Sequence, residues 1–345
     1  MATRDIIVIG ASAGGVQALS TVVEGLPRDL PAAVFIVLHI SAHIPSLLPD
    51  ILGRESKLSV AHPVGIERIA HGHVYVAPPD QHLVIEGEYV RLIHGPKENL
   101  HRPSIDALFR SVARWAGPRA VGVVLTGARD DGKVGMRALK QRGGITIIQD
   151  PQEAPFPSMP MSVMHDIEVD YLLPVGEIAP MLDRLSREAT EEEGSYSVPD
   201  ELEIESRIAE QKMEGDELIA SVERIGTISK LTCPDCHGAL WEINDDHILR
   251  YRCHVGHAYS AEALSEGQAG MLEVALWSAV RALEEKVVLA RRIVERARKK
   301  GSHQRAAILF ERRAREAEQH SAAIRELLLN AEKADEGERV GKNAD

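Results

Sequence analysis

Four near-continuous apolar runs constrain the fold of this chain more than any other feature. Unbroken runs rich in β-branched residues are typical of strands covered on both faces, as in parallel sheets. The runs are Ile6 to Ile9, Ala33 to Leu38, Val121 to Leu125 and Ile145 to Ile148. Segments with helical spacing, 104–115 and 133–141, lie between them and suit crossover helices. We therefore predict an α/β domain over residues 1–187, with a doubly wound, mostly parallel sheet.

Two further stretches of this domain predict a β-hairpin insertion. His73 to Val76 and His82 to Ile93 are rich in strand-forming residues, and Gly87 provides a turn. We expect these stretches to form a β-hairpin insertion in the domain.

Residues 188–345 predict smaller parts. Residues 188–230 begin with a strongly acidic stretch, which favours a solvated acidic linker that runs into a helix. Residues 231–260 hold all three cysteines and predict a small metal-binding unit. In 261–334, apolar residues recur at alternating steps of four and three in two seams, which predicts an antiparallel helical hairpin. Residues 335–345 have little apolar content and predict a frayed tail.

Composition excludes several classes of protein. The 345 residues include 40 Lys+Arg and 52 Asp+Glu, and the resulting net charge of -12 disfavours binding to nucleic acid. Three cysteines in so long a chain favour a reducing compartment over a disulfide framework. Glycines interrupt the apolar N-terminal segment, and no run reaches the length of a membrane span, so we expect a soluble cytoplasmic protein without membrane insertion.

Three polar side chains follow three of the predicted strands. Ser12 lies in Gly10-Ala-Ser-Ala-Gly14, a G-x-S-x-G turn; His39 ends the second run, and Asp131 follows the third. Because the carboxyl ends of parallel strands meet at one edge of a sheet, these groups can supply a nucleophile, a base and an orienting acid, with no cofactor. Each residue also has a structural explanation: a small-residue turn can serve packing, a lone histidine can belong to the core, and Asp before Gly often caps a turn.

Seven motifs in order resemble one known family. They are Ile9-Gly-Ala-Ser-Ala-Gly-Gly15, Val37-Leu-His-Ile40, Val74-Tyr-Val-Ala-Pro78 with His82, Arg102-Pro-Ser-Ile-Asp-Ala-Leu-Phe109, Leu125-Thr-Gly127 with Asp131-Gly132, Gln149-Asp150 and Met159-Pro160. Over about residues 4 to 187 the chain is similar to the catalytic domain of bacterial chemotaxis protein-glutamate methylesterases, the CheB family.

The resemblance implies hydrolysis of glutamate γ-methyl esters on the cytoplasmic helices of methyl-accepting chemoreceptors, together with deamidation of receptor glutamines. It implies that Ser12 is the nucleophile, His39 the general base and Asp131 the orienting acid. Asp130 is excluded because the family aspartate directly precedes the glycine that Gly132 matches.

Several departures from the family pattern leave a second function open. Ala13 stands where threonine is usual, and Ala128-Arg129 replaces Met-Gly, so Arg129 enters a loop built for glycine. The receiver domain that usually precedes this domain is not found, and we expect regulation to differ. The alternative is a catalytically weak signalling adaptor that binds receptor helices and recruits other signalling proteins through the C-terminal helices.

The cysteines predict a zinc site. Cys233-Pro-Asp-Cys236 and Cys253-His-Val-Gly-His257 have the spacing of two knuckles that close on one tetrahedral Zn²⁺. We expect Cys233, Cys236, Cys253 and His257 as ligands, with the adjacent His254 turned elsewhere. Four protein ligands would make the metal structural. The alternatives are three reduced thiols in a small β unit or, with less support because a βαβ context is missing, a redox C-x-x-C pair.

Overall fold

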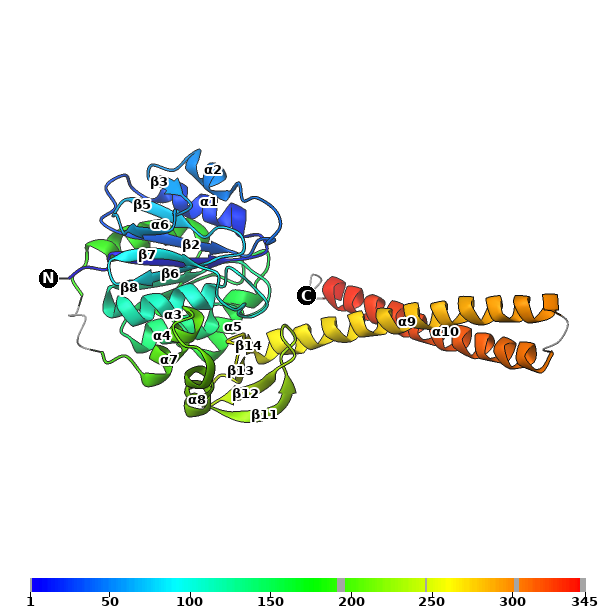
Figure 1. Ribbon diagram of the computed structural model, residues 1–345. Coiled ribbons are helices and arrows are strands. Elements are labelled where there is room, and N and C mark those ends of the chain that lie inside the picture. Colours follow the sequence, from blue (N-terminus) through cyan, green and yellow to red (C-terminus); the bar gives the residue numbers. More distant parts are fainter. Residues whose placement is uncertain (1, 191–195, 246, 301–303, 342–345) are drawn as a thin grey trace. The chain divides into compact units, whose positions relative to one another are not determined.

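The computed structural model describes residues 2–190, 196–245, 247–300 and 304–341, without the side chains of 300 and 331–341 (Figure 1). Two compact units divide the chain, Met1–Ser265 and Glu266–Asp345. The first unit is larger than the predicted domain of residues 1–187.

A seven-stranded parallel sheet forms the centre of the first unit. Its order is β10-β9-β8-β1-β2-β5-β3, and every pairing in it is parallel. The strands are β1 (Ile6–Ala11), β2 (Ala33–Leu38), β3 (Ser59–Ala61), β5 (His73–Val76), β8 (Ala120–Val124), β9 (Ile145–Gln149) and β10 (Tyr171–Leu173). The four predicted runs are β1, β2, β8 and β9, which lie next to one another in the sheet. The chain leaves β1 toward β2 and later returns to pair β8 on its other side, so a topological switch point lies between β1 and β8.

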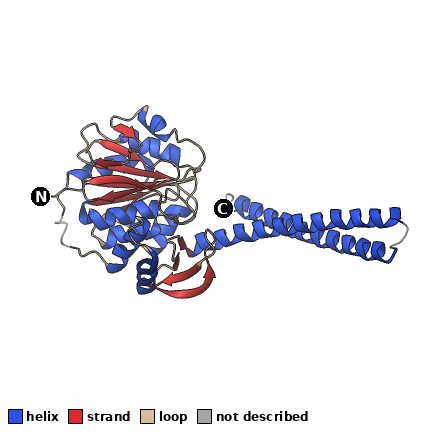
Figure 2. Cartoon of the chain, viewed as in Figure 1, coloured by secondary structure: helices blue, strands red, loops and turns tan. Residues whose placement is uncertain are grey.

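Helices cover both faces of this sheet, as predicted (Figure 2). Successive strand residues point to opposite faces, so Ile6 and Val8 belong to one core cluster and Ile7 and Ile9 to the other. The first cluster includes residues of α3 (Ile105–Trp115), α4 (Lys133–Gln141) and α5 (Ser158–Asp166). The second includes residues of α1 (Gly15–Gly25), α2 (Leu48–Gly53) and α6 (Val175–Arg187). A 3-10 turn, η1 (Gly117–Arg119), leads into β8.

The predicted hairpin insertion is confirmed only in part. β6 (His82–Glu86) and β7 (Tyr89–Ile93) pair antiparallel around Gly87, whose φ is 61°, and β4 (Ile66–Arg68) adds a third strand. The assignment of His73 to Val76 to this insertion is wrong, because β5 pairs in parallel with β2 in the main sheet. Three buried residues in a four-residue strand fit either environment, so sequence alone does not separate them.

The acidic segment differs from a solvated spacer. It contains α7 (Asp200–Ala209) and α8 (Gly215–Ile225), and Leu202 of α7 joins the core cluster of the main sheet. The carboxylate of Glu205 is also buried. Residues 191–195 of the predicted linker lie outside the described residues.

A four-stranded antiparallel sheet follows, with the order β11-β12-β13-β14. Its strands are β11 (Gly226–Thr232), β12 (Ala239–Ile243), β13 (Arg250–Cys253) and β14 (Ala258–Ser260). β11 begins before Leu231, where the predicted metal-binding unit starts. We call 226–260 the Cys/His unit.

Buried ion pairs connect the Cys/His unit to the parallel-sheet core. Glu205 accepts hydrogen bonds from Arg250 at 2.5 Å and from Arg252 at 2.8 Å. Arg252 also lies 3.6 Å from Glu98, which pairs with Arg110 of α3. A buried charge is tolerated only when it is paired, so these contacts explain how an acidic segment becomes part of a core.

The second unit is a helical hairpin that contains most of α9 (Ala261–Lys300) and α10 (Gln304–Gly341). The predicted helical hairpin is thereby confirmed. Ion pairs join Arg298 to Glu311, Arg291 to Glu318 and Glu284 to Arg325. The residue numbers rise along α10 as they fall along α9, so the two helices are antiparallel. Val287, Ala290 and Val294 of α9 recur at steps of three and four, as in the predicted seams, and are buried. Residues 301–303, between the two helices, and residues 342–345 of the predicted tail lie outside the described residues. α10 itself extends to Gly341.

Among the described residues, no helix is both long and apolar enough to traverse a bilayer.

Replacing Glu205 by Ala should lower the free energy of unfolding by roughly 3 to 5 kcal/mol, because it removes the buried carboxylate that Arg250 and Arg252 share. Glu203→Ala is the matched control on the same helix. Its side chain is 40% exposed and its pair with Arg114 should contribute about 1 kcal/mol or less. Urea unfolding of the two variants measures the difference, and equal losses would contradict a structural role for the buried pairs.

Candidate active site

Ser12 lies directly after β1, on the tight turn that leads into α1. The amide of Ser12 donates a hydrogen bond to the Thr126 carbonyl at 3.0 Å, which fixes the turn against the end of β8. Gly14 has a φ of 73°, and a Cβ on Gly15 would lie 2.7 Å from that of Ala11. A left-handed residue and a close helix approach therefore both require glycine at the positions that present the Ser12 hydroxyl.

The structure brings Ser12, His39 and Asp131 into one hydrogen-bonded row. His39 Nδ1 lies 3.2 Å from Ser12 Oγ, and His39 Nε2 lies 2.7 Å from Asp131 Oδ2. The His39 and Asp131 side chains are 5% and 2% exposed. These residues follow β1, β2 and β8, so the switch point of the sheet brings them together.

Asp131 is held by the N-terminus of α3. Its carboxylate accepts hydrogen bonds from the backbone amides of Ile105 at 2.7 Å and Asp106 at 3.2 Å, and from Ser104 Oγ at 3.0 Å. Asn99 Nδ2 donates a further bond at 2.9 Å. Burial alone would raise the pKa of Asp131, but the hydrogen bond and positive charge of His39 hold it well below its ordinary value. Asp131 is therefore a carboxylate at neutral pH.

Asp130 lies apart from His39. Its carboxylate accepts a hydrogen bond from Ser260 Oγ at 2.8 Å and lies 3.5 Å from Lys133 Nζ. Of the two adjacent aspartates, Asp131 is the one that contacts the histidine.

His101 belongs to the site although no sequence motif pointed to it. Its ring stacks on that of His39, with centroids 3.6 Å apart and an interplanar angle of 8°. Burial, reinforced by the charge of His39, lowers the pKa of His101 to about 3, so its imidazole is neutral at neutral pH. A lone histidine in a polar stretch gives no periodic or spacing signal, and only the fold places it over His39.

Two of the positions that depart from the family pattern, Ala13 and Arg129, lie next to Ser12 and His101. Arg129 has a φ of 72°, the left-handed conformation that favours glycine, and its Nη1 lies 3.4 Å from His101 Nε2. The backbone amide of Arg129 donates to Ser158 Oγ at 3.1 Å. Within the described part of the chain, the amides of Ala13 and Ala128 donate to no protein acceptor. They are therefore candidates to hold an oxyanion.

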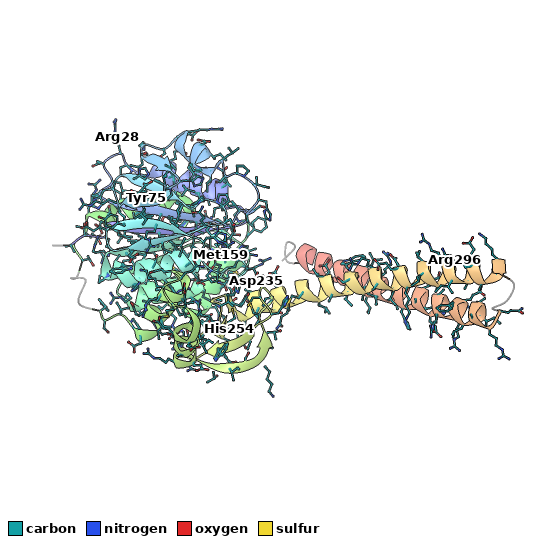
Figure 3. All side chains as sticks on the ribbon, viewed as in Figure 1. Arg28, Tyr75, Met159, Asp235, His254 and Arg296 are labelled. Carbon is teal, nitrogen blue, oxygen red and sulfur yellow. The ribbon has the colours of Figure 1, made fainter. Side chains whose placement is uncertain are left out.

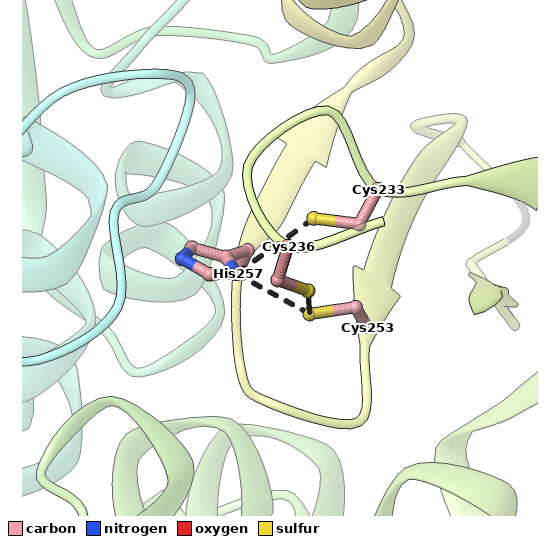
Figure 4. A group of neighbouring side chains, drawn as sticks. All are labelled: Cys233, Cys236, Cys253 and His257. Carbon is pink, nitrogen blue, oxygen red and sulfur yellow. Dashed lines mark hydrogen bonds between the residues drawn. The ribbon is translucent and has the colours of Figure 1, made fainter. Parts of the chain in front are cut away.

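A second cluster of reactive side chains lies in the Cys/His unit (Figure 4). The ligand atoms of Cys233, Cys236, Cys253 and His257 all lie within 4.8 Å of one another. Cys236 Sγ is 3.7 Å from Cys253 Sγ, and His257 Nδ1 is 3.7 and 3.5 Å from the sulfurs of Cys233 and Cys253. Tetrahedral Zn²⁺ with Zn–S bonds near 2.3 Å requires sulfurs ~3.8 Å apart, so this donor set fits zinc.

His254 is not one of the four residues whose ligand atoms lie within 4.8 Å of one another. Its ring meets the edge of Trp241 with centroids 6.2 Å apart, and a Cβ on Gly238 would lie 2.6 Å from His254 Cε1. Figure 3 labels Asp235, in the turn between β11 and β12, and His254, in the turn between β13 and β14. Of the two histidines in the second knuckle, His257 is the one within the group of four.

Comparison with known proteins identifies the family. The family model described as CheB methylesterase matches residues 7–182. The chain belongs to the CheB methylesterase family. The predicted resemblance, the fold class and the assignment as a carboxylic ester hydrolase are thereby confirmed.

Individual relatives agree with this assignment. A protein-glutamate methylesterase/protein-glutamine glutaminase of Leptospira interrogans is 36% identical over 189 residues, 54% of this chain and 98% of that protein. One of Xanthomonas euvesicatoria is 39% identical over 191 residues; the chain spans about half its length, 53%. The catalytic domain of the Thermotoga maritima CheB methylesterase has a TM-score of 0.51 at 32% identity, covering 52% of this chain and 98% of that domain.

The low pKa of His101 predicts a pH-dependent stability. Below about pH 6.5 the unfolded chain protonates this histidine and the folded protein does not, so stability falls as pH drops from about 6.5 toward 3. The free energy of unfolding should fall between pH 7 and pH 4.5 in wild type. In His101→Gln this fall should be smaller by about 2 to 3 kcal/mol. Urea unfolding at both pH values tests this, with His43→Gln, an exposed histidine, as the control that should keep the wild-type pH dependence.

Proposed function

We propose that this chain is a serine esterase that hydrolyses glutamate γ-methyl esters on chemoreceptor helices, with Ser12 as nucleophile. The observation that carries the proposal is the continuous contact from Ser12 Oγ through His39 to Asp131. An alcohol is a weak nucleophile at neutral pH, and it needs a base that is itself oriented by a third group.

The first half of the reaction forms an acyl-enzyme. His39 Nδ1 removes the hydroxyl proton as Ser12 Oγ bonds to the ester carbonyl carbon, and Asp131 stabilises the imidazolium through Nε2. The amides of Ala13 and Ala128 donate to the oxyanion. The tetrahedral intermediate collapses as the C–O bond to the methoxy group breaks, and His39 returns its proton to release methanol.

The second half repeats this chemistry with water. His39 deprotonates a water molecule that attacks the acyl carbon, and the proton then passes to Ser12 as the glutamate carboxylate leaves. A glutamine side chain presents the same carbonyl with ammonia as the leaving group, so deamidation follows from the same residues. No cofactor takes part in either half.

We also propose that Cys233, Cys236, Cys253 and His257 hold a structural zinc ion. Support comes from the distances among their ligand atoms and from the burial of Cys233 and Cys253. A bound zinc would cross-link the two knuckles of a sheet that has a small core of its own. Cysteines that bind a metal must stay reduced, and a reducing compartment keeps them so. We therefore propose that the protein is located in the cytoplasm.

Ser12→Ala should abolish methanol release from a methylated receptor fragment, because no other group attacks the ester carbonyl. The side chain is small and partly exposed, so thermal unfolding should be nearly unchanged. Ser20→Ala, on the adjacent helix α1, is the matched control and should keep wild-type turnover. Methanol release by purified Ser12→Ala at the wild-type rate would refute the nucleophile assignment.

Metal analysis of protein purified without chelator should find about one zinc per chain. Cys236→Ser should lose most of this zinc, since three ligands no longer close a tetrahedral site. His254→Gln is the matched histidine control and should retain it, because His254 faces Trp241. Zinc loss in His254→Gln but not in His257→Gln would show that the ligand assignment is wrong.

A further inference from the structure

A short loop, Glu98 to His101, joins the Cys/His unit to the active site. The loop closes on itself, since the Glu98 amide donates to the His101 carbonyl at 3.1 Å and the His101 amide to the Glu98 carbonyl at 2.9 Å. Asn99 and Leu100 at its tip have φ values of 50° and 69°. The left-handed conformation is unfavourable for leucine by roughly 1 to 2 kcal/mol, so contacts outside the loop must hold it.

The Cys/His unit provides contacts on one side of the loop. The Asn99 amide donates to the Ala258 carbonyl at 2.8 Å, and the Ala258 amide to the Lys97 carbonyl at 3.3 Å. Leu100 packs against the core cluster that contains Cys233 and Cys253. Ala258 directly follows His257, so the strand that grips the loop begins at a proposed metal ligand.

The catalytic residues provide contacts on the other side. The Asn99 side chain donates from Nδ2 to Asp131 Oδ1 and to Asp106 Oδ2, both at 2.9 Å. Its Oδ1 accepts a hydrogen bond from the Ser260 amide of β14 at 2.8 Å. Two carboxylates face the nitrogen and an N–H group faces the oxygen, so only one orientation of the amide satisfies all three contacts. Asn99 is 5% exposed.

We infer that Asn99 is a positioning residue that connects the Cys/His unit to the catalytic row, so that metal binding in this unit sets the rate of ester hydrolysis. The inference rests on the proposed esterase and zinc site. β14, which begins next to His257, binds Asn99 through the Ala258 carbonyl and the Ser260 amide, and a metal bound by His257 would order this strand. The Asn99 Nδ2 group in turn holds the Asp131 carboxylate toward His39. The same loop carries His101, whose ring stacks on His39. An independent metal unit would leave ester hydrolysis unchanged when the metal is lost.

A double-mutant cycle on the full chain tests this connection. Asn99→Ala should keep about one zinc per chain and lower kcat on a small neutral ester by roughly 10- to 100-fold, the range typical when a partner of a site residue is removed. Cys236→Ser should lose zinc and lower kcat by a similar factor. If the metal acts through Asn99, the double variant should be no slower than the slower single variant, whereas independent effects would multiply. Multiplied losses, or full kcat in the zinc-free variant, would overturn the inference.

Lys97→Met is the matched control for the interface. It removes the 3.4 Å ion pair between Lys97 and Asp235 of the first knuckle but leaves the Asn99 hydrogen bonds in place. Its zinc content and kcat should stay within about twofold of wild type, because this 3.4 Å ion pair is partly exposed and contributes little. A loss as large as that of Asn99→Ala would point to general loosening of the interface and contradict a specific role for Asn99.

Asn99→Asp separates positioning from simple support of the loop. The aspartate keeps an acceptor for the Ser260 amide but replaces the donor to Asp131 with a carboxylate oxygen. If Asn99 only supports the loop, Asn99→Asp should restore the kcat that Asn99→Ala loses. If Asn99 positions Asp131, kcat should stay low, and the added negative charge beside Asp131 should move the acid limb of the kcat/KM profile to higher pH. Wild-type kcat with an unchanged pH profile would refute the assignment.

Hydrogen exchange gives a readout that does not depend on activity. Chelation of zinc in wild type should speed amide exchange at residues 97–101, while β1 at the centre of the parallel sheet stays protected. The proposed effect of the metal would be overturned if amide exchange at residues 97–101 were unchanged after zinc removal. It would also be overturned if purified wild-type protein contained no zinc. Faster exchange together with undiminished turnover in Ser12→Ala would instead show that the contact exists and that the proposed nucleophile fails.

Discussion

The buried carboxylate of Asp131 is the group on which the geometry of the site depends. Removing a carboxylate from water costs several kcal/mol, and the fold offsets this with donors from α3, from Asn99 and from His39. A helix N-terminus stabilises negative charge. The first turn of α3 must therefore lie beside Asp131, which follows β8. The parallel sheet provides that arrangement, because the carboxyl ends of β1, β2 and β8 meet at the switch point.

The imidazole of His39 lies between a charged and a neutral group. Asp131 stabilises the cation that forms when His39 takes a proton, while His101 stacks on the ring without adding a positive charge of its own. The lowered pKa of His101 maintains this difference over the pH range in which a serine esterase works. Arg129 adds a permanent cation beyond His101, and its backbone has the left-handed conformation that glycine adopts most readily. The charge around the row therefore differs from that of a site with glycine at this position.

Sequence predicted the parts of the structure that local patterns determine. The buried strands are continuous apolar runs, and the row of Ser12, His39 and Asp131 follows from where three of those strands end. His101 and Asn99 could not be found in this way, because their roles come from contacts with residues far apart in the chain. Asn99, for example, bonds to Asp131 and to Ser260. The acidic segment was predicted as a spacer for the same reason: the arginines that neutralise Glu205 lie in β13, and no pattern in 188–230 reveals them.

The compact unit extends well beyond the matched family region, and the physical reason lies in the loop at Glu98. Its carboxylate is 1% exposed and lies between Arg110 of α3 and Arg252 of β13. If the Cys/His unit moved away, Arg252 and Glu98 would both lose a partner and Leu100 would leave an apolar cluster, each at a cost of order 1 kcal/mol or more. Because Asn99 and His101 flank Leu100, that same displacement would disturb both the carboxylate and the ring that orient His39. Stability of the unit and precision of the site thus depend on the same four-residue loop.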